Sequence, residues 1–266
     1  MKRSILFWIL AFLITTASAI YQRMTGPTYP VSGTAMLKGK EIQYKLKRSE
    51  ESVGNHKIQV RTDDSNIHGY VEWKRNKTLD EWTRVEMKFD NGLLLAELPM
   101  QPPAGKLQYR VYLQDATQTI ALPADGPVIL RFKGPVPLVV LIFHILVIFS
   151  AMLLSSRTGI EIFAQEPKFT GLTYWTVALL IGGGMILGPI VQKFAFDVYW
   201  SGWPFGTDLT DNKMAAAILS WIAAAVAVKK SPNPKRWILA AAIVTIAVFL
   251  IPHSLHGSEL DYTKVK

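Results

Sequence analysis

The residues whose types could carry chemistry are a few histidines and carboxylates in the second half of the chain. His144 lies inside an apolar stretch, whereas His253 and His256 follow the last apolar stretch. Two histidines at one depth can ligate a haem, and carboxylates combined with imidazole can bind a divalent cation. The candidate haem ligands are therefore His144 and His253. The candidate metal ligands are Asp208, Asp211, His253, His256, Glu259 and Asp261.

Each of these residues also has a simpler structural interpretation, which we favour. With ~1.5 Å of helix per residue, His144 lies roughly 10 Å deeper than His253, which disfavours a bis-histidine haem. A hydrogen bond from His144 to a neighbouring helix is the alternative. Asp211 or Asn212 would cap the helix that follows. We therefore predict no resident cofactor, and keep a haem and a divalent cation as less favoured possibilities.

Motifs of common enzyme sites are missing from the sequence. It contains no phosphate loop, no HExxH pattern and no nucleophile elbow. The absence of cysteine excludes disulfides and thiolate metal sites. His56 and His68 have no partner at ligand spacing and are expected to be solvated. A catalytic role is thus less favoured than a non-enzymatic one.

The positions of these residues depend on apolar stretches that are typical of membrane spans. Half of the 266 residues are apolar, which indicates an integral membrane protein with a soluble insert. The first stretch, in residues 1–22, is predicted to be a signal anchor, although Ala17-Ser18-Ala19 resembles a signal-peptidase site. A four-helix bundle is predicted over 135–252, with spans at 136–154, 172–191, 214–228 and 237–251. The total is five spans if the first is retained and four if it is cleaved.

Residues 23–134 have a different pattern, in which apolar and polar residues alternate over short runs. This period of two predicts half-buried β-strands. Asp90-Asn91-Gly92 is typical of a tight hairpin turn, and residues 102–105 (Pro-Pro-Ala-Gly) indicate a second reversal. The insert is therefore expected to be an all-β, immunoglobulin-like sandwich without a disulfide.

The basic residues predict the orientation in the membrane. The net charge of +9 is not gathered into one block, so we expect no nucleic-acid binding. Lys and Arg cluster at the N-terminus, in 157–168 and in 229–236, whereas the loop 192–213 holds only Lys193 and Lys213. By the positive-inside rule, the N-terminus is cytoplasmic, and the β domain, the loop 192–213 and the tail 253–266 are extracytoplasmic. In that loop, Tyr199, Trp200 and Trp203 would lie at the headgroup level.

Three phrases carry a resemblance to a known group of proteins. YQRMTGPTYP, GWPFGTDLTDNK and IPHSLHGSELDY resemble phrases of multi-pass bacterial inner-membrane proteins of unassigned function. The resemblance implies the bacterial inner membrane, and implies no reaction, cofactor or site residue. The β insert is similar, in strand pattern alone, to immunoglobulin-like accessory domains of other membrane proteins.

Two functions from different classes follow from these observations. The first is a non-enzymatic accessory or assembly subunit, whose β domain binds another membrane or periplasmic protein. The second is a redox or ion or proton transport subunit that uses His144 as a b-type haem ligand, or the outer histidine and aspartate set. Since no catalytic pattern accompanies the external domain, we favour the first.

Overall fold

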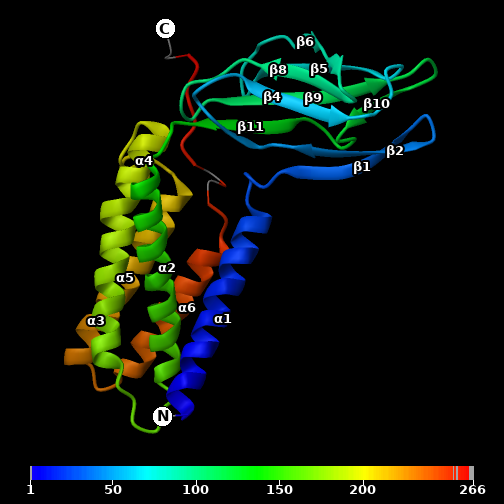
Figure 1. Cartoon of the computed structure of the whole chain (residues 1–266). Coiled ribbons are helices and arrows are strands. Elements are labelled where there is room, and N and C mark those ends of the chain that lie inside the picture. Colours follow the sequence, from blue (N-terminus) through cyan, green and yellow to red (C-terminus); the bar gives the residue numbers. More distant parts are fainter. Residues whose placement is uncertain (1, 254, 256, 264–266) are drawn as a thin grey trace. The chain divides into compact units, whose positions relative to one another are not determined.

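The computed structural model describes residues 2–253, 255 and 257–263. The chain forms two compact units, one helical and one made of β-strands (Figure 1). The helical unit comprises Met1–Pro27 and Val136–Ser258, and the β unit comprises Thr28–Pro135 and Glu259–Lys266. Because the first helix continues to Thr25, the β unit begins later than the predicted residue 23. The predicted tail 253–266 divides between the two units after Ser258.

The helical unit contains a bundle of apolar helices. Its elements are α1 (Lys2–Thr25), α2 (Leu138–Glu161), α3 (Phe169–Leu180), a π-helical segment η1 (Ile181–Leu187), α4 (Gly188–Phe196), α5 (Leu209–Lys230) and α6 (Pro234–Leu250). In the described part of the chain, four helical stretches are long and apolar enough to cross a membrane: α1 from Arg3, α2, the continuous run α3–η1–α4, and α5. The chain is therefore a membrane protein. The last predicted span corresponds to α6, whose 17 residues give ~25 Å of helix.

The wide turn η1 lies where the sequence has three consecutive glycines and then Pro189. Proline cannot donate to the carbonyl four residues earlier, and its ring crowds that carbonyl. The adjacent Gly188 N–H instead donates to the carbonyl of Gly183, five residues back. A side chain added at Gly183 would lie 3.2 Å from the backbone nitrogen of Ile148, so the glycines also allow α2 to approach closely.

Small residues hold the bundle together, as predicted from the alanine-rich spans. A side chain added at Gly159 of α2 would lie 2.6 Å from the Cβ of Ala242 in α6. Close approach of this kind provides the van der Waals packing that stabilises helix pairs in lipid. Trp221 of α5 is fully buried, and its indole N–H donates to the Thr245 hydroxyl of α6 at 2.8 Å.

The structure corrects the far end of the second predicted span, 136–154. The helix α2 continues to Glu161 because Arg157 and Glu161, one turn apart, form a buried ion pair. The Arg157 guanidinium also lies over the rings of Phe7 and Trp8 in α1. A charge pair with these partners can stay inside the bundle, so a polar sequence there does not end the helix.

The β unit contains three sheets in its described residues. Its strands are β1 (Val31–Leu37), β2 (Lys40–Leu46), β3 (Ser49–Glu51), β4 (His56–Arg61), β5 (His68–Arg75), β6 (Thr83–Glu86), β7 (Lys88–Asp90), β8 (Leu93–Leu98), β9 (Lys106–Gln114), β10 (Thr119–Leu122) and β11 (Val128–Lys133). The largest sheet has the order β3-β11-β9-β5-β6, with β10 paired to β9. The smaller sheets are β4-β8-β7 and β1-β2. All pairs are antiparallel except β3 with β11.

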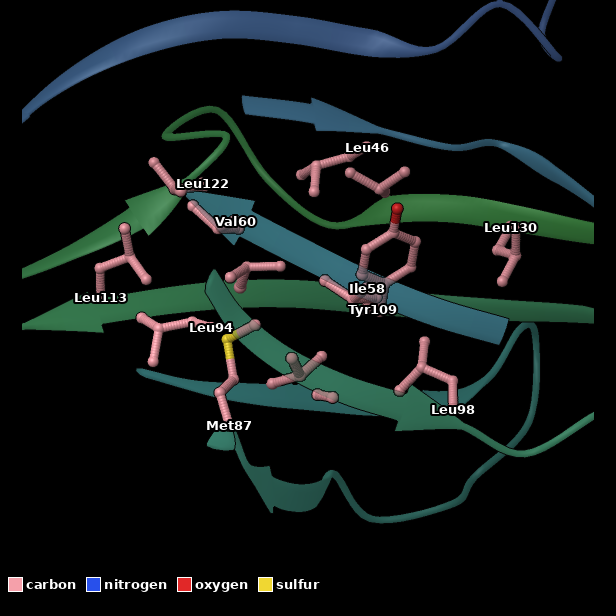
Figure 2. Close-up of a cluster of buried hydrophobic side chains, with 14 of the residues drawn as sticks. Leu46, Ile58, Val60, Met87, Leu94, Leu98, Tyr109, Leu113, Leu122 and Leu130 are labelled. Carbon is pink, nitrogen blue, oxygen red and sulfur yellow. The ribbon is translucent and has the colours of Figure 1, made fainter. Parts of the chain in front are cut away.

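The three sheets enclose one apolar core, which includes Leu37, Ile58, Leu94, Leu113 and Leu130. Figure 2 shows Tyr109 of β9 within the cluster of buried side chains that also includes Ile58 and Leu94. Its ring is fully buried, and its hydroxyl donates to the carbonyl of Lys47 at 2.8 Å. The alternation along β9 is strict, with inward residues buried and outward residues half-buried. Core packing therefore holds this unit together without a disulfide.

Both predicted reversals are confirmed. Asn91 and Gly92 connect β7 and β8, and both have positive φ angles, 49° and 81°. Asp90 pairs with Leu93, so the loop has the two residues of a tight hairpin. The other reversal closes through a hydrogen bond from Gly105 N–H to the carbonyl of Pro102 at 2.9 Å. Ala104 there has a φ of 67°.

Candidate functional site

The loop between α4 and α5 is folded around the carboxylate of Asp211. One carboxylate oxygen accepts from the backbone N–H groups of Ser201 and Gly202 at 2.7 and 3.0 Å. It also accepts from the amide of Gln192 at 3.1 Å. The side-chain oxygen of Asn212 accepts a hydrogen bond from the Trp203 N–H at 2.7 Å. Residues at the start of α5 thus hold the preceding loop in one conformation.

Asp208 is the N-cap of α5. One of its oxygens accepts from the Thr210 N–H at 2.7 Å, which satisfies a donor at the start of the helix. The other accepts from the Ser258 N–H at 2.9 Å, and the hydroxyls of Ser201 and Ser258 are 2.9 Å apart. The predicted cap residues were wrong: Asp208, rather than Asp211 or Asn212, caps α5, because the helix begins earlier than the predicted span.

The acidic residues of the tail have their partners in the β unit. Glu259 accepts from Asn76 at 3.0 Å and forms ion pairs with Lys77 and Lys106. Burial alone would raise the pKa of Glu259, but hydrogen bonds and charges from Lys77 and Lys106 outweigh it and hold this pKa below its usual range. Asp261 accepts from the N–H and hydroxyl of Thr263.

The predicted metal ligands therefore fall into two groups with different partners. Asp208 and Asp211 belong to the helical unit, and Glu259 and Asp261 to the β unit. His253 is exposed in the turn after α6, within electrostatic range of Asp208, Lys213 and His144. His256 lies outside the described residues. Among the residues that the structure describes, no three histidine or carboxylate side chains are grouped so that they could hold a metal ion.

His144 contacts a neighbouring helical segment, as predicted. Its Nδ1 lies 3.1 Å from the carbonyl oxygen of Gly183 in η1. That oxygen also accepts from the Gly188 N–H. Since a carbonyl can only accept, Nδ1 carries the proton and Nε2 is the remaining acceptor in the neutral ring. The histidine thus ties α2 to the widest turn of the bundle.

Two polar residues that the sequence analysis missed satisfy the end of α6. Lys213 is buried, and its ammonium donates to the carbonyl of Ile251. The amide of Gln22 in α1 donates to the carbonyls of Phe249 and Ile251 at 2.7 and 3.2 Å. The last carbonyls of a helix have no partner within the helix, so side chains from α1 and α5 supply the donors. A lysine immediately before an apolar span was the signal that could have identified this role.

The outer face of the largest β-sheet carries aromatic and basic side chains. We call the following set the aromatic–basic face: Tyr70, Lys74, Trp82, Arg84, Arg110 and Tyr112. Two carboxylates lie on the same side of the sheet, Glu72 opposite Arg110 and Glu86 opposite Tyr70. Tyr70 and Tyr112 pair across β5 and β9 and stack, with ring centroids 4.7 Å apart. The Arg84 guanidinium lies 3.6 Å from the centre of the Tyr70 ring. Lys74 and Arg110 lie 5.3 and 5.9 Å from the centre of the Trp82 ring.

The aromatic–basic face follows from strand alternation, but its members come from three segments. Tyr70 and Tyr112 are half-buried, on strands whose alternate residues enter the core. The alternation could have assigned each of them to the outer side of a strand. Their assembly into one face depends on the pairing of β5 with β9 and with β6, which alternation alone does not predict.

His56 corrects another expectation. We expected a solvated side chain, whereas His56 is 1 % exposed at the start of β4. Its Nδ1 lies 2.7 Å from a carboxylate oxygen of Glu50. A polar neighbour supplied by the segment after β2 allows the ring to be buried. His68 is exposed, as expected.

Comparisons with known proteins do not assign a function to these residues. No protein-family model matches the chain, and the search of curated proteins gives no significant match.

Proposed function

We propose that this chain is a membrane-anchored, non-enzymatic accessory subunit whose β unit binds a protein partner through the aromatic–basic face. The observation that carries the proposal is the composition and order of that face. Tyrosine, tryptophan and arginine are the residue types enriched at the energetic centres of protein interfaces. Here, Tyr70, Trp82 and Arg84 each contact another member of the face.

Preorganisation supports the proposal. Ordering a free arginine or lysine side chain at an interface costs ~0.5–1.5 kcal/mol. The cation of Arg84 is already held by the Tyr70 ring and by the carboxylate of Glu86 at 2.6 Å, and that of Arg110 lies near Trp82. Part of this cost is therefore met before a partner arrives.

The polar residues of the helical unit also fit a structural anchor. Asp208 and Asp211 organise a loop, Lys213 and Gln22 satisfy the end of α6, and His144 binds a backbone carbonyl. Each has a role in holding helices or loops in place. We therefore prefer the accessory role over a haem or transport role for this unit.

The setting we propose is the bacterial inner membrane. The charge bias of the sequence supports a cytoplasmic N-terminus, with the β unit and the C-terminus in the periplasm. The resemblance of the three phrases to bacterial inner-membrane proteins supports the same compartment. We propose that the β unit is an immunoglobulin-like sandwich, because its sheets are antiparallel except for the β3–β11 pair and enclose one core. The partner would then be a periplasmic protein or the periplasmic part of another membrane protein.

Co-purification in a mild detergent tests the proposal. The wild-type chain should retain a stoichiometric partner, and the double variant Arg110→Ala/Tyr112→Ala should lose most of it. The matched control, Lys88→Ala/Glu97→Ala, removes two exposed residues of the β4-β8-β7 sheet. Equal recovery of the partner with both double variants would contradict the assignment of the face. Recovery of the wild-type chain alone would contradict the accessory role.

A further inference from the structure

A separate cavity in the β unit has the features of a ligand site. Its volume is about 460 Å³, within the range of ~300–1,000 Å³ typical of small-molecule pockets. Residues from the end of β2, from β3, from the start of β4 and from β9 line it. The polar lining includes Lys45, Lys47, Glu50, Asn55, His56 and Lys57.

The buried group in this cavity is the imidazole of His56. Its Nδ1 is engaged with Glu50 at 2.7 Å, and Glu50 also accepts from Lys47 at 3.1 Å. A carboxylate partner on one ring nitrogen fixes the orientation of the ring. Tyr109 also lines the cavity. Its hydroxyl is not available to a ligand as a donor, because it donates to the Lys47 carbonyl. Nε2 of His56 is then the ring nitrogen left for a ligand.

The rim of the cavity is positively charged. Three lysines, at positions 45, 47 and 57, are among its lining residues, against the single carboxylate of Glu50. That carboxylate is already shared by Lys47 and His56. The exposed ammonium of Lys57 lies 4.0 Å from Glu97, and a solvent-exposed pair at that distance holds the lysine only weakly. An anion in the cavity would therefore meet a net positive field.

We propose that this cavity binds a phosphate-bearing ligand, with the lysine rim around the phosphate and His56 Nε2 bonded to one phosphate oxygen. Lysine acts as a point charge for phosphate groups, and a cavity of this volume holds a phosphate together with a small organic group. The phosphate could come from a soluble ester or from a lipid headgroup. This inference does not depend on the aromatic–basic face, whose residues are different.

Binding should be linked to a proton. Burial lowers the pKa of His56, although Glu50 partly opposes that effect. The other groups around the ring are Glu50, Lys45, Lys47, Lys57, Tyr109 and the nearby Arg48. Hydrogen bonds from His56 and Lys47 outweigh the burial of Glu50 and lower its pKa, while burial raises the pKa of Tyr109. Because a bound dianion favours the imidazolium form, and a phosphate ester stays mostly dianionic above its second pKa of about 6, affinity should rise as the pH falls from 8 towards 7.

The test uses the full chain in phosphatidylcholine nanodiscs, titrated calorimetrically with glycerol 3-phosphate. We expect saturable binding that is about tenfold weaker in Lys45→Gln/Lys57→Gln, because each lost charge costs a contact with the phosphate. The matched control, Lys40→Gln/Lys88→Gln, removes two exposed lysines that do not line the cavity. His56→Gln should abolish the rise in affinity between pH 8 and pH 7. The lysine variants keep the test decisive if His56→Gln does not fold.

A second arm separates the two sources of phosphate. Weaker binding of the soluble ester in nanodiscs that contain phosphatidylglycerol would assign the site to a lipid headgroup. Unchanged binding would assign it to a soluble ester. The proposal is overturned if neither glycerol 3-phosphate nor phosphatidylglycerol binds, or if the cavity variant and the control variant have equal affinity. Such a failure would leave co-purification through the aromatic–basic face unaffected.

Discussion

Lys213 donates a hydrogen bond from its ammonium group to the carbonyl oxygen of Ile251, 38 residues further along the chain. The same carbonyl accepts from Gln22, so α1, α5 and α6 meet at one oxygen. Each of these helices ends or begins at this level. The last carbonyls of α6 are thereby satisfied at a place where the chain leaves the bundle.

Removing the ammonium of Lys213 should destabilise the helical unit. Lys213→Met keeps the length of the side chain but leaves the Ile251 carbonyl with Gln22 as its remaining side-chain donor. Loss of a hydrogen bond to a charged group costs ~1.5–3 kcal/mol, which should lower the melting temperature measured in detergent. The control is Lys230→Met, at an exposed position in the last turn of the same helix. Equal melting temperatures for the two variants would refute this role.

The loop before α5 should lose its order when Asp211 is truncated. Asp211→Ala removes the acceptor of the Ser201 and Gly202 N–H groups. Buried donors without an acceptor cost ~1–3 kcal/mol each, and 1.4 kcal/mol corresponds to a tenfold change in an equilibrium constant. Hydrogen exchange of these two amides should therefore be at least about tenfold faster. Asp197→Ala, at the highly exposed partner of Lys193, should leave their exchange unchanged.

The ion pairs that join Glu259 to Lys77 and Lys106 should weaken as the pH falls. The folded-state pKa of Glu259 is lowered by Lys77 and Lys106, so its contribution is complete above the unfolded pKa of ~4.3. The contribution is lost as the pH falls through the folded value. A spin label at Thr263→Cys, in a chain without other cysteines, should become more mobile on acidification below about pH 4.

Glu259→Gln is the matched control for that experiment. The amide keeps the size of the side chain and cannot titrate, so the label should have the same mobility across the whole range. If the label in the wild-type background is equally mobile at pH 7 and pH 3, the ion pairs of Glu259 do not hold this segment.

Several features of the fold could be predicted because they depend on residues close together in the sequence. The positive φ angles at Asn91 and Gly92 follow from residue types that tolerate them, so the hairpin between β7 and β8 was predictable. The strict alternation of β9 likewise marked Tyr109 and Val111 as buried. The apolar stretches predicted the long helices in the same way.

The features that sequence reasoning missed depend on partners far away in the chain. The burial of His56 requires Glu50, and the burial of Arg157 requires the rings of Phe7 and Trp8. The stacking of Tyr70 on Tyr112 requires a specific register between two strands. Neither composition nor periodicity specifies such pairs. For the same reason, the sequence could not show that Asp208 and Glu259 have separate partners.

The most direct test of the proposed function is photo-crosslinking from the aromatic–basic face in living cells. A benzophenone amino acid at position 112 places the reactive group where the stacked ring of Tyr112 lies, half-exposed on β9. The same probe at position 97, exposed on β8, is the control. The account predicts one discrete protein adduct from position 112 and not from position 97. Identical adduct patterns from both positions, or an adduct from position 97 alone, would contradict it.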